Sequence, residues 1–202
     1  YDLIHGWILL DADRAAVLDA IARAASYGVN HVQLSHDLIM NIDEVLGDAP
    51  EAITRIDTLN AAIEAAHGQG MEAYVWAHEW SEEPLGICYA PDDPVWERRA
   101  DAYRQGLARL PGVDGVVLMF GSAPMPPWFT LCTCGWCLEE EGSTPLSSPT
   151  QADRIRLIVE HLGGVITDEL GKGLLIRTFV HEPPEIAWHG VGLADVAGVP
   201  FA

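Results

Sequence analysis

Apolar residues along this chain fall into two alternating patterns. Short stretches rich in apolar residues, typical of buried strands, cover residues 3–10, 31–35, 73–77, 116–120 and 174–180. Between them, apolar residues recur every three or four positions, which predicts amphipathic helices. The clearest of these helical stripes contains Trp96, Ala100, Tyr103, Leu107 and Leu110.

The other predicted helices have matching start and stop signals. Asp11 or Asp13 can cap the first helix, which Gly28 ends. Pro50 suits the first turn of the second helix, which Gly68 ends. The apolar stripes are Val17, Leu18, Ile21, Ala22 and Ala25 in the first helix, Ile53, Ile56, Leu59 and Ile63 in the second, and Ile155, Ile158, Leu162 and Ile166 in the fourth.

Strands that alternate with helices of this length predict the α/β class, because parallel strands need a crossover connection and a helix supplies it. Residues 9–13, after the first strand, contain no glycine, and no G-x-x-x-x-G-K sequence occurs, which argues against nucleotide-binding folds. We therefore predict a (β/α) TIM-type barrel. Eight βα units need about 250 residues, so residues 1–202 are expected to form one barrel domain, or its N-terminal part with only the first five units.

The chain carries a large negative charge. It has 30 Asp and Glu against 11 Lys and Arg, a formal net charge of −19, which should repel nucleic acids and anionic membrane surfaces. With 49% hydrophobic residues and no apolar run near the ~20 that span a bilayer, we expect a soluble protein, cytoplasmic or secreted. Because the chain starts at Tyr1 without Met, a processed protein or a segment of a longer one is expected. Self-association or further chain would cover the open strand edges.

Polar and aromatic residues gather where the predicted strands end. In (β/α) barrels, the carboxyl ends of the strands carry the active site. The strands are entered, in contrast, through turn sequences such as Gly68-Gln69-Gly70 and Gly171-Lys172-Gly173, which offer little to a substrate. The residues at the carboxyl ends are His36 and Asp37 after the second strand, His78, Glu79 and Trp80 after the third, and His181 and Glu182 after the fifth.

These residue types suit carbohydrate chemistry. Two carboxylates from different strand ends are what a glycosidase needs, so we expect Glu182 as the acid/base and Glu79 as its partner. The alternatives are ordinary ones: hydrogen-bonded core histidines, solvated carboxylates, and an internal ion pair for Arg177. The residues expected to bind substrate are His36, Asp37, His78, Trp80, Arg177 and His181.

The four cysteines predict a metal site. Cys132, Cys134 and Cys137 form a C-x-C-x-x-C sequence after the fourth strand, and Cys88 lies in the loop after the third. Loops that follow parallel strands emerge at one sheet edge, so four thiolates can complete a structural zinc site with no open position for catalysis. The alternatives are disulfides or free buried thiols, although the tight C-x-C spacing strains a disulfide within the cluster.

Four segments together resemble a known family. They are residues 88–96, residues 110–118, the C-x-C-x-x-C sequence and His181-Glu182-Pro183. They resemble the barrel of bacterial glycoside hydrolase-like proteins, which are related in outline to α-glucuronidases and β-hexosaminidases, over roughly residues 70–185. The resemblance implies a catalytic acid at the end of the fourth strand. Residues 120–124 contain no carboxylate there, which leaves Glu79 and Glu182 as the best-placed pair.

Two other functions fit the same residues. A sugar isomerase or epimerase would hold a catalytic divalent ion with the histidines and carboxylates at the strand ends. A non-catalytic module would bind a glycan without turnover. A chelator that abolishes activity without unfolding the protein would favour the first, and sugar binding unaltered by Glu182→Gln would favour the second.

Overall fold

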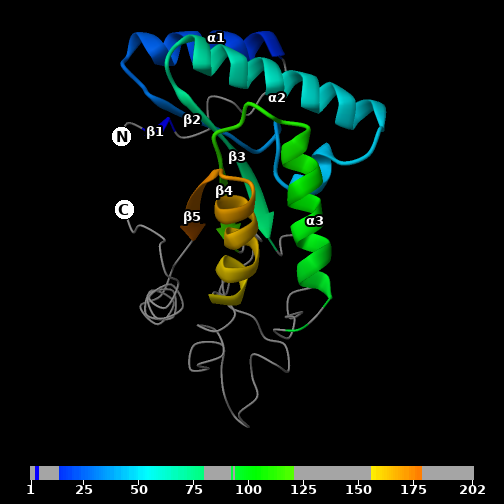
Figure 1. Ribbon diagram of the computed structural model, residues 1–202. Coiled ribbons are helices and arrows are strands. Elements are labelled where there is room, and N and C mark those ends of the chain that lie inside the picture. Colours follow the sequence, from blue (N-terminus) through cyan, green and yellow to red (C-terminus); the bar gives the residue numbers. More distant parts are fainter. Residues whose placement is uncertain (1–2, 5–13, 80–91, 93, 121–155, 179–202) are drawn as a thin grey trace, which may run out of the picture.

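The computed structural model describes residues 3–4, 14–79, 92, 94–120 and 156–178. Its centre is a five-stranded parallel sheet whose strands lie in the order in which the chain reaches them (Figure 1). The strands are β1 (Leu3–Ile4), β2 (His31–Leu34), β3 (Glu72–Glu79), β4 (Gly115–Phe120) and β5 (Gly173–Thr178). The predicted α/β class and parallel sheet are thus confirmed, and this strand order is the one that (β/α) barrels use.

Helices connect successive strands. They are α1 (Arg14–Ser26), α2 (Pro50–Gly68) and α3 (Val95–Ala108). A short 3-10 turn, η2 (Ile42–Val45), precedes α2. Between β4 and β5 lies a helix that contains two π-helical segments, η3 (Val159–Gly163) and η4 (Val165–Glu169), and we call it the wide helix. Figure 1 shows α1 and α2 side by side across one end of the sheet, while α3 runs along it. Within the described residues, no helix combines the length and apolar character that crossing a membrane requires.

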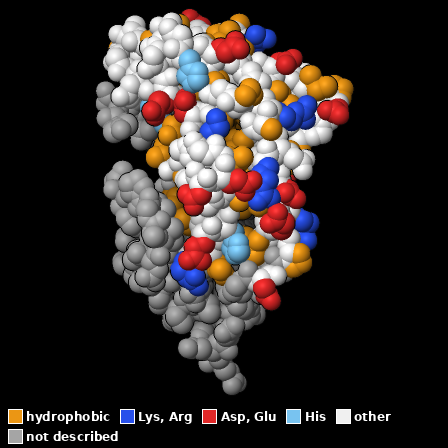
Figure 2. Space-filling model, viewed as in Figure 1, with side chains coloured by type: hydrophobic (Ala, Val, Ile, Leu, Met, Phe, Trp, Pro, Cys, Tyr) orange, Lys and Arg blue, Asp and Glu red, His pale blue; other side chains and the backbone are white. Residues whose placement is uncertain are grey.

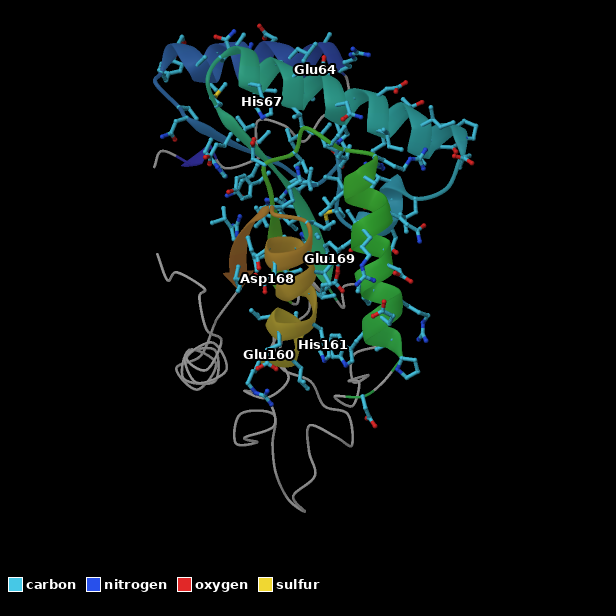
Figure 3. The ribbon with its side chains drawn as sticks, in the orientation of Figure 1. Glu64, His67, Glu160, His161, Asp168 and Glu169 are labelled. Atoms are coloured by element: carbon cyan, nitrogen blue, oxygen red, sulfur yellow. The ribbon has the colours of Figure 1, made fainter. Side chains whose placement is uncertain are left out.

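The described contacts of the wide helix with α3 include a stacked ring pair and an ion pair. The rings of Trp96 and His161 stack with centroids 4.6 Å apart and planes 10° apart. Arg104 Nε lies 2.7 Å from Glu169 Oε1, and Figure 3 shows His161 and Glu169 on the wide helix. On the outer surface, acidic and basic side chains are interspersed over α3 and its neighbours (Figure 2).

The two faces of the sheet differ in what they contact. Val32, Val75 and Val116 belong to the main core, which the strands form with the helices. Residues of the other parity face away from the helices, and Trp76, Val117 and Met119 form a second, smaller cluster there. We call this second side the inner face. Its described residues include Gln33, Tyr74, Trp76, His78, Val117, Met119, Leu175 and Arg177.

Tyr74 crosses the inner face over two glycines. Gly115 and Gly173 are the first residues of β4 and β5 and pair with each other in register. A Cβ atom on Gly173 would lie 2.2 Å from the Tyr74 hydroxyl oxygen, and one on Gly115 would lie 2.2 Å from the Tyr74 ring and 2.4 Å from the Gly173 carbonyl oxygen. Only glycine fits beneath this ring at either position.

Candidate functional site

Four residues converge on the inner face near the carboxyl ends of the strands. Trp76 lies at their centre, with ring centroids 4.9 Å from His36 and 5.3 Å from His78, and the Arg177 guanidinium carbon lies 4.8 Å above its ring. The indole Nε1–H donates a 2.9 Å hydrogen bond to Gln33 Oε1. We call His36, Trp76, His78 and Arg177 the Trp76 cluster.

Strand register explains why these residues meet. His78 pairs with Met119 of β4, and Met119 pairs with Arg177 of β5, so all three lie at one level of the sheet. Side chains two residues apart on a strand share a face, which places Trp76 beside His78. The cluster therefore combines residues from three segments that are far apart in the sequence.

The electrostatics of the cluster favour neutral imidazoles beside one cation. Burial, followed by the neighbouring His36 and Arg177, lowers the pKa of His78 from 6.5 to about 4. Burial and then Arg177 also lower the pKa of His36, and Asp37 opposes the change. Burial lowers the pKa of Arg177, although a guanidinium keeps its proton at neutral pH. At pH 7 the cluster carries one formal positive charge.

His36 holds an unusual backbone conformation. Its φ angle of 56° lies in the left-handed region, which few residues other than glycine occupy, although histidine is among those enriched there. The Ser35 hydroxyl lies 2.9 Å from His36 Nδ1. Residues in such conformations cluster at functional sites, because the surrounding structure must hold them in place.

His36 lies in the loop formed by residues 35–49, which we call the β2–α2 loop. Arginines in α2 and next to α3 hold this loop in place. Arg55 of α2 donates a 2.8 Å hydrogen bond to the Asp37 carbonyl and another to the Leu38 carbonyl, and it pairs with Glu44 at 3.0 Å. Arg109, next to α3, donates to the carbonyls of Val45 and Gly47.

Two further contacts tie the loop to β3 and α3. The His78 backbone N–H donates a 2.8 Å hydrogen bond to the Met40 carbonyl, and Arg99 of α3 pairs with Asp43 at 2.7 Å. The β2–α2 loop is thus fixed from three sides, and His36 with it.

Glu79 lies on the opposite face from the cluster. Its carboxylate is 3% exposed and faces α3. Arg99 donates to both oxygens, at 2.9 Å and 3.2 Å, and the Tyr103 hydroxyl donates at 2.5 Å. Burial and then the Glu79 charge raise the pKa of Tyr103 well above 10. Glu79 therefore joins the end of β3 to α3.

The structure brings together three of the residues predicted to bind substrate: His36, His78 and Arg177. Asp37 is exposed, and its backbone carbonyl accepts the Arg55 hydrogen bond. Glu79 is not brought to the cluster. Seven predicted site residues lie outside the described part of the chain: Trp80, Cys88, Cys132, Cys134, Cys137, His181 and Glu182.

Sequence reasoning missed Trp76 and Gln33. Both belong to predicted strands, and Trp76 is two residues before His78 and therefore on the same face of the strand. Gln33, a polar residue inside a strand, was a second signal. For a metal, the described residues bring no three His, Cys, Asp or Glu side chains together.

Comparisons with known proteins concern the fold. A scan of protein-family models and a sequence search of curated proteins each found no match. Among solved structures, the chain resembles a Thermobaculum terrenum O-GlcNAc hydrolase mutant, with 14% identity, a TM-score of 0.52, and coverage of 92% of this chain and 35% of that one. A GH5_18 protein from Streptomyces cattleya, in complex with GlcNAc, has 18% identity, a TM-score of 0.48, and coverage of 86% and 42%.

A third structure, described as a GH138 enzyme targeting pectin rhamnogalacturonan II, has 10% identity, a TM-score of 0.47, and coverage of 85% of this chain and 20% of that one. The chain thus spans less than half the length of each of these three proteins. The similarity to the O-GlcNAc hydrolase shows a shared fold, which the glycoside hydrolase-like resemblance of the sequence had predicted.

Proposed function

We propose that this chain provides the first five units of a (β/α) barrel in a glycoside hydrolase-like protein that acts on a glycan or oligosaccharide. The observation that carries the proposal is the Trp76 cluster, which lies at the carboxyl ends of the strands, where such barrels bind their substrates. The fold shared with an O-GlcNAc hydrolase supports it.

The cluster has the donors and acceptors that sugar hydroxyls require. A neutral imidazole offers one donor and one acceptor, and a guanidinium offers up to five donors. His36 and Arg177 are partly exposed, while Trp76 and His78 are buried beneath them. A sugar would therefore contact His36 and Arg177 directly, and Trp76 would orient them.

For hydrolysis, we propose Glu182 as the acid/base, because it follows β5, whose Arg177 belongs to the cluster. A catalytic part for Glu79 would require its carboxylate to leave Arg99 and Tyr103. This engagement favours a second candidate function, a module that binds glycans without turnover.

The test has two parts. Glycan binding is measured by tryptophan fluorescence and on an array of oligosaccharides. Hydrolysis is measured by the release of reducing sugar. We expect His36→Ala and His78→Gln to weaken binding at least tenfold. His67→Gln is the matched control, because His67 is an exposed histidine on α2 whose described partner is Asp114, which lies outside the Trp76 cluster (Figure 3 labels His67). Loss of turnover with retained binding in Glu182→Gln would support hydrolysis. Binding without turnover in the unaltered protein would support the module, and no binding to any glycan would overturn both.

We also propose that Cys88, Cys132, Cys134 and Cys137 hold a structural zinc ion. β3 and β4 are neighbours whose last residues, Glu79 and Phe120, pair in register, so the two cysteine-bearing segments leave from adjacent points of one sheet edge. Elemental analysis with a thiol titration under denaturing conditions tests this. One zinc and four free thiols per chain are expected, whereas no metal and no free thiols would indicate disulfides.

A further inference from the structure

We infer that Arg55 and Glu44 are positioning residues of the proposed glycan site, because together they hold His36 in a strained turn after β2. The inference rests on the proposed function and adds residues that act on the site without touching the sugar. It starts from the backbone of His36. Its φ angle of 56° is the one positive value among the described residues other than glycine.

His36 occupies the second position of a tight turn. The Leu38 backbone N–H donates a 3.2 Å hydrogen bond to the Ser35 carbonyl, which closes a four-residue turn. The φ angle is positive at His36 and not at Asp37. This is the pattern of a type II′ turn, which ordinarily has glycine at its second position. A residue with a Cβ atom is strained there, so the surrounding structure must stabilise it.

Arg55 of α2 stabilises the part of the turn that directly follows His36. One terminal nitrogen of its guanidinium donates a 2.8 Å hydrogen bond to the Asp37 carbonyl and another to the Leu38 carbonyl. The other terminal nitrogen pairs with Glu44 at 3.0 Å. A planar guanidinium presents its donors in a fixed fork and can make these contacts together, whereas an ammonium acts as a point charge.

Glu44 holds the next part of the loop. One of its carboxylate oxygens accepts 2.9 Å hydrogen bonds from the backbone N–H groups of both Met40 and Asn41. Arg55 and Glu44, which we call the loop clamp, thus bind four backbone groups between residues 37 and 41. Their side chains are 28% and 26% exposed, so salt screens this pair less than a fully solvated one.

The clamp acts on the conformation of the turn more than on the attachment of the loop. The side chains of Leu38 and Ile39 are 2% and 0% exposed and already anchor the loop in the core. The turn holds the His36 ring with its centroid 4.9 Å from that of Trp76. Glycine would relieve the turn but would remove this ring from the Trp76 cluster. We therefore attribute the strain to the need for an imidazole at this position.

The first experiment measures the strain. His36→Gly should melt at least about 3 °C above His36→Ala, because glycine adopts a positive φ readily. Asp37 is the control, since its φ is not positive. Asp37→Gly should therefore melt below Asp37→Ala. Equal melting temperatures of the two His36 variants would show that the turn is not strained and would overturn the inference.

The second experiment tests Arg55. The measurements are the His36 imidazole signal in NMR spectra, assigned by its absence from His36→Gly, and binding to the oligosaccharide array. Arg55→Met should shift the His36 signal and weaken binding at least fivefold, while Arg55→Lys should retain part of both. Arg104→Met is the matched control and should change neither. Arg104 is 31% exposed, and its described partners lie on α3 and the wide helix.

Glu44 should act with Arg55 as one unit. Glu44→Ala should also shift the His36 signal, and the double variant should shift it by less than the sum of the two single changes. Glu160→Ala is the control, because Glu160 pairs with Arg156 on the wide helix. Additive shifts would mean that the two residues act independently and would overturn the clamp.

The outcomes separate this inference from the proposed function. Circular dichroism identifies the variants that fold, and Arg55→Lys carries the comparison if Arg55→Met does not. An unchanged His36 signal in a folded Arg55 variant, or an equal change in Arg104→Met, would overturn the clamp and leave the glycan site intact. Absence of glycan binding by the unaltered protein would overturn the proposed function and the part of the clamp in it. The NMR signal would still decide whether the clamp holds His36.

Discussion

His78 and Glu79 are consecutive residues of β3 with opposite surroundings. Because side chains alternate along a strand, His78 faces the Trp76 cluster and Glu79 faces α3. Both are at most 5% exposed, and both are polar. Burial lowers the pKa of His78, whereas the Glu79 carboxylate accepts hydrogen bonds from Arg99 and Tyr103.

Glu79→Gln should destabilise the protein by about 2–4 kcal/mol, because breaking a buried ion pair leaves the partner charge uncompensated. Arg99 retains its ion pair with Asp43, which limits the loss.

Tyr103→Phe should cost about 1–3 kcal/mol by removing a hydrogen bond to a charged group. Urea unfolding measures both values.

The control for Glu79 is Glu160→Gln, which removes a surface pair with Arg156 on the wide helix and should change stability by less than about 0.5 kcal/mol. If Glu79 is catalytic instead, Glu79→Gln will unfold at the same urea concentration as the unaltered protein and lose turnover.

His78 should make the fold less stable in mild acid. Its pKa is 6.5 in the unfolded chain and about 4 in the folded protein, so the unfolded chain binds more protons between these values. The contribution of His78 to the free energy of unfolding is therefore fully present above pH 6.5. It is lost as the pH drops toward 4, and the loss is on the order of 3 kcal/mol. His78→Gln should lose less stability than the unaltered protein between pH 7 and pH 5. An imidazole signal of His78 that titrates near 6.5 in NMR spectra would contradict this.

At the scale of elements, local signals in the sequence predicted much of what the structure contains. Helix α2 begins at Pro50 and ends at Gly68, as predicted from the sequence. The apolar stripe from Trp96 to Leu107 is buried along α3. These features depend on residues a few positions apart. The position of Arg177 on the inner face likewise follows from the alternation of side chains along β5.

Contacts between distant residues explain what could not be predicted. The third strand was expected to end at Ala77, but it continues to Glu79 because Arg99 and Tyr103 accommodate the carboxylate. The fourth helix was expected from its stripe, and Ile158, Leu162 and Ile166 are buried as predicted. Its π-helical hydrogen bonding was not predicted, since a four-residue spacing does not distinguish it from an α-helix.

The start of β5 should tolerate only glycine. Gly173→Ala places a Cβ 2.2 Å from the Tyr74 hydroxyl and should cost about 1–3 kcal/mol, part of which Tyr74→Phe should restore. Gly115→Ala should cost more and resist this rescue, because it also meets the Gly173 carbonyl at 2.4 Å. Thermal and urea unfolding give these values.

Gly164 is the control for both substitutions. It is helical, and nothing lies within 4 Å of its Cβ position, so alanine there should stabilise the protein by about 0.5–1 kcal/mol. Equal losses at the three glycines would indicate a general effect of alanine and not the Tyr74 contact.

At the scale of the whole molecule, the net charge of −19 should determine how stability depends on salt concentration. Like charges on a compact protein repel, and salt screens them, with a Debye length of about 30 Å at 0.01 M and about 8 Å at 0.15 M. Raising the salt concentration over this range should therefore raise the melting temperature by a few degrees. Sodium and potassium chloride should act alike. A fall in melting temperature would mean that the attraction within surface pairs such as Arg104–Glu169 outweighs the repulsion.

The β2–α2 loop has a consequence for how the molecule meets a ligand. Fixing the backbone of a residue costs about 1–2 kcal/mol of conformational entropy, and a mobile loop incurs that cost when it binds. Here Arg55, Arg99 and Arg109 hold the loop through contacts within the protein itself. The ordering entropy is thus lost during folding, and little of it remains to oppose association. The protein itself thus holds His36 in position.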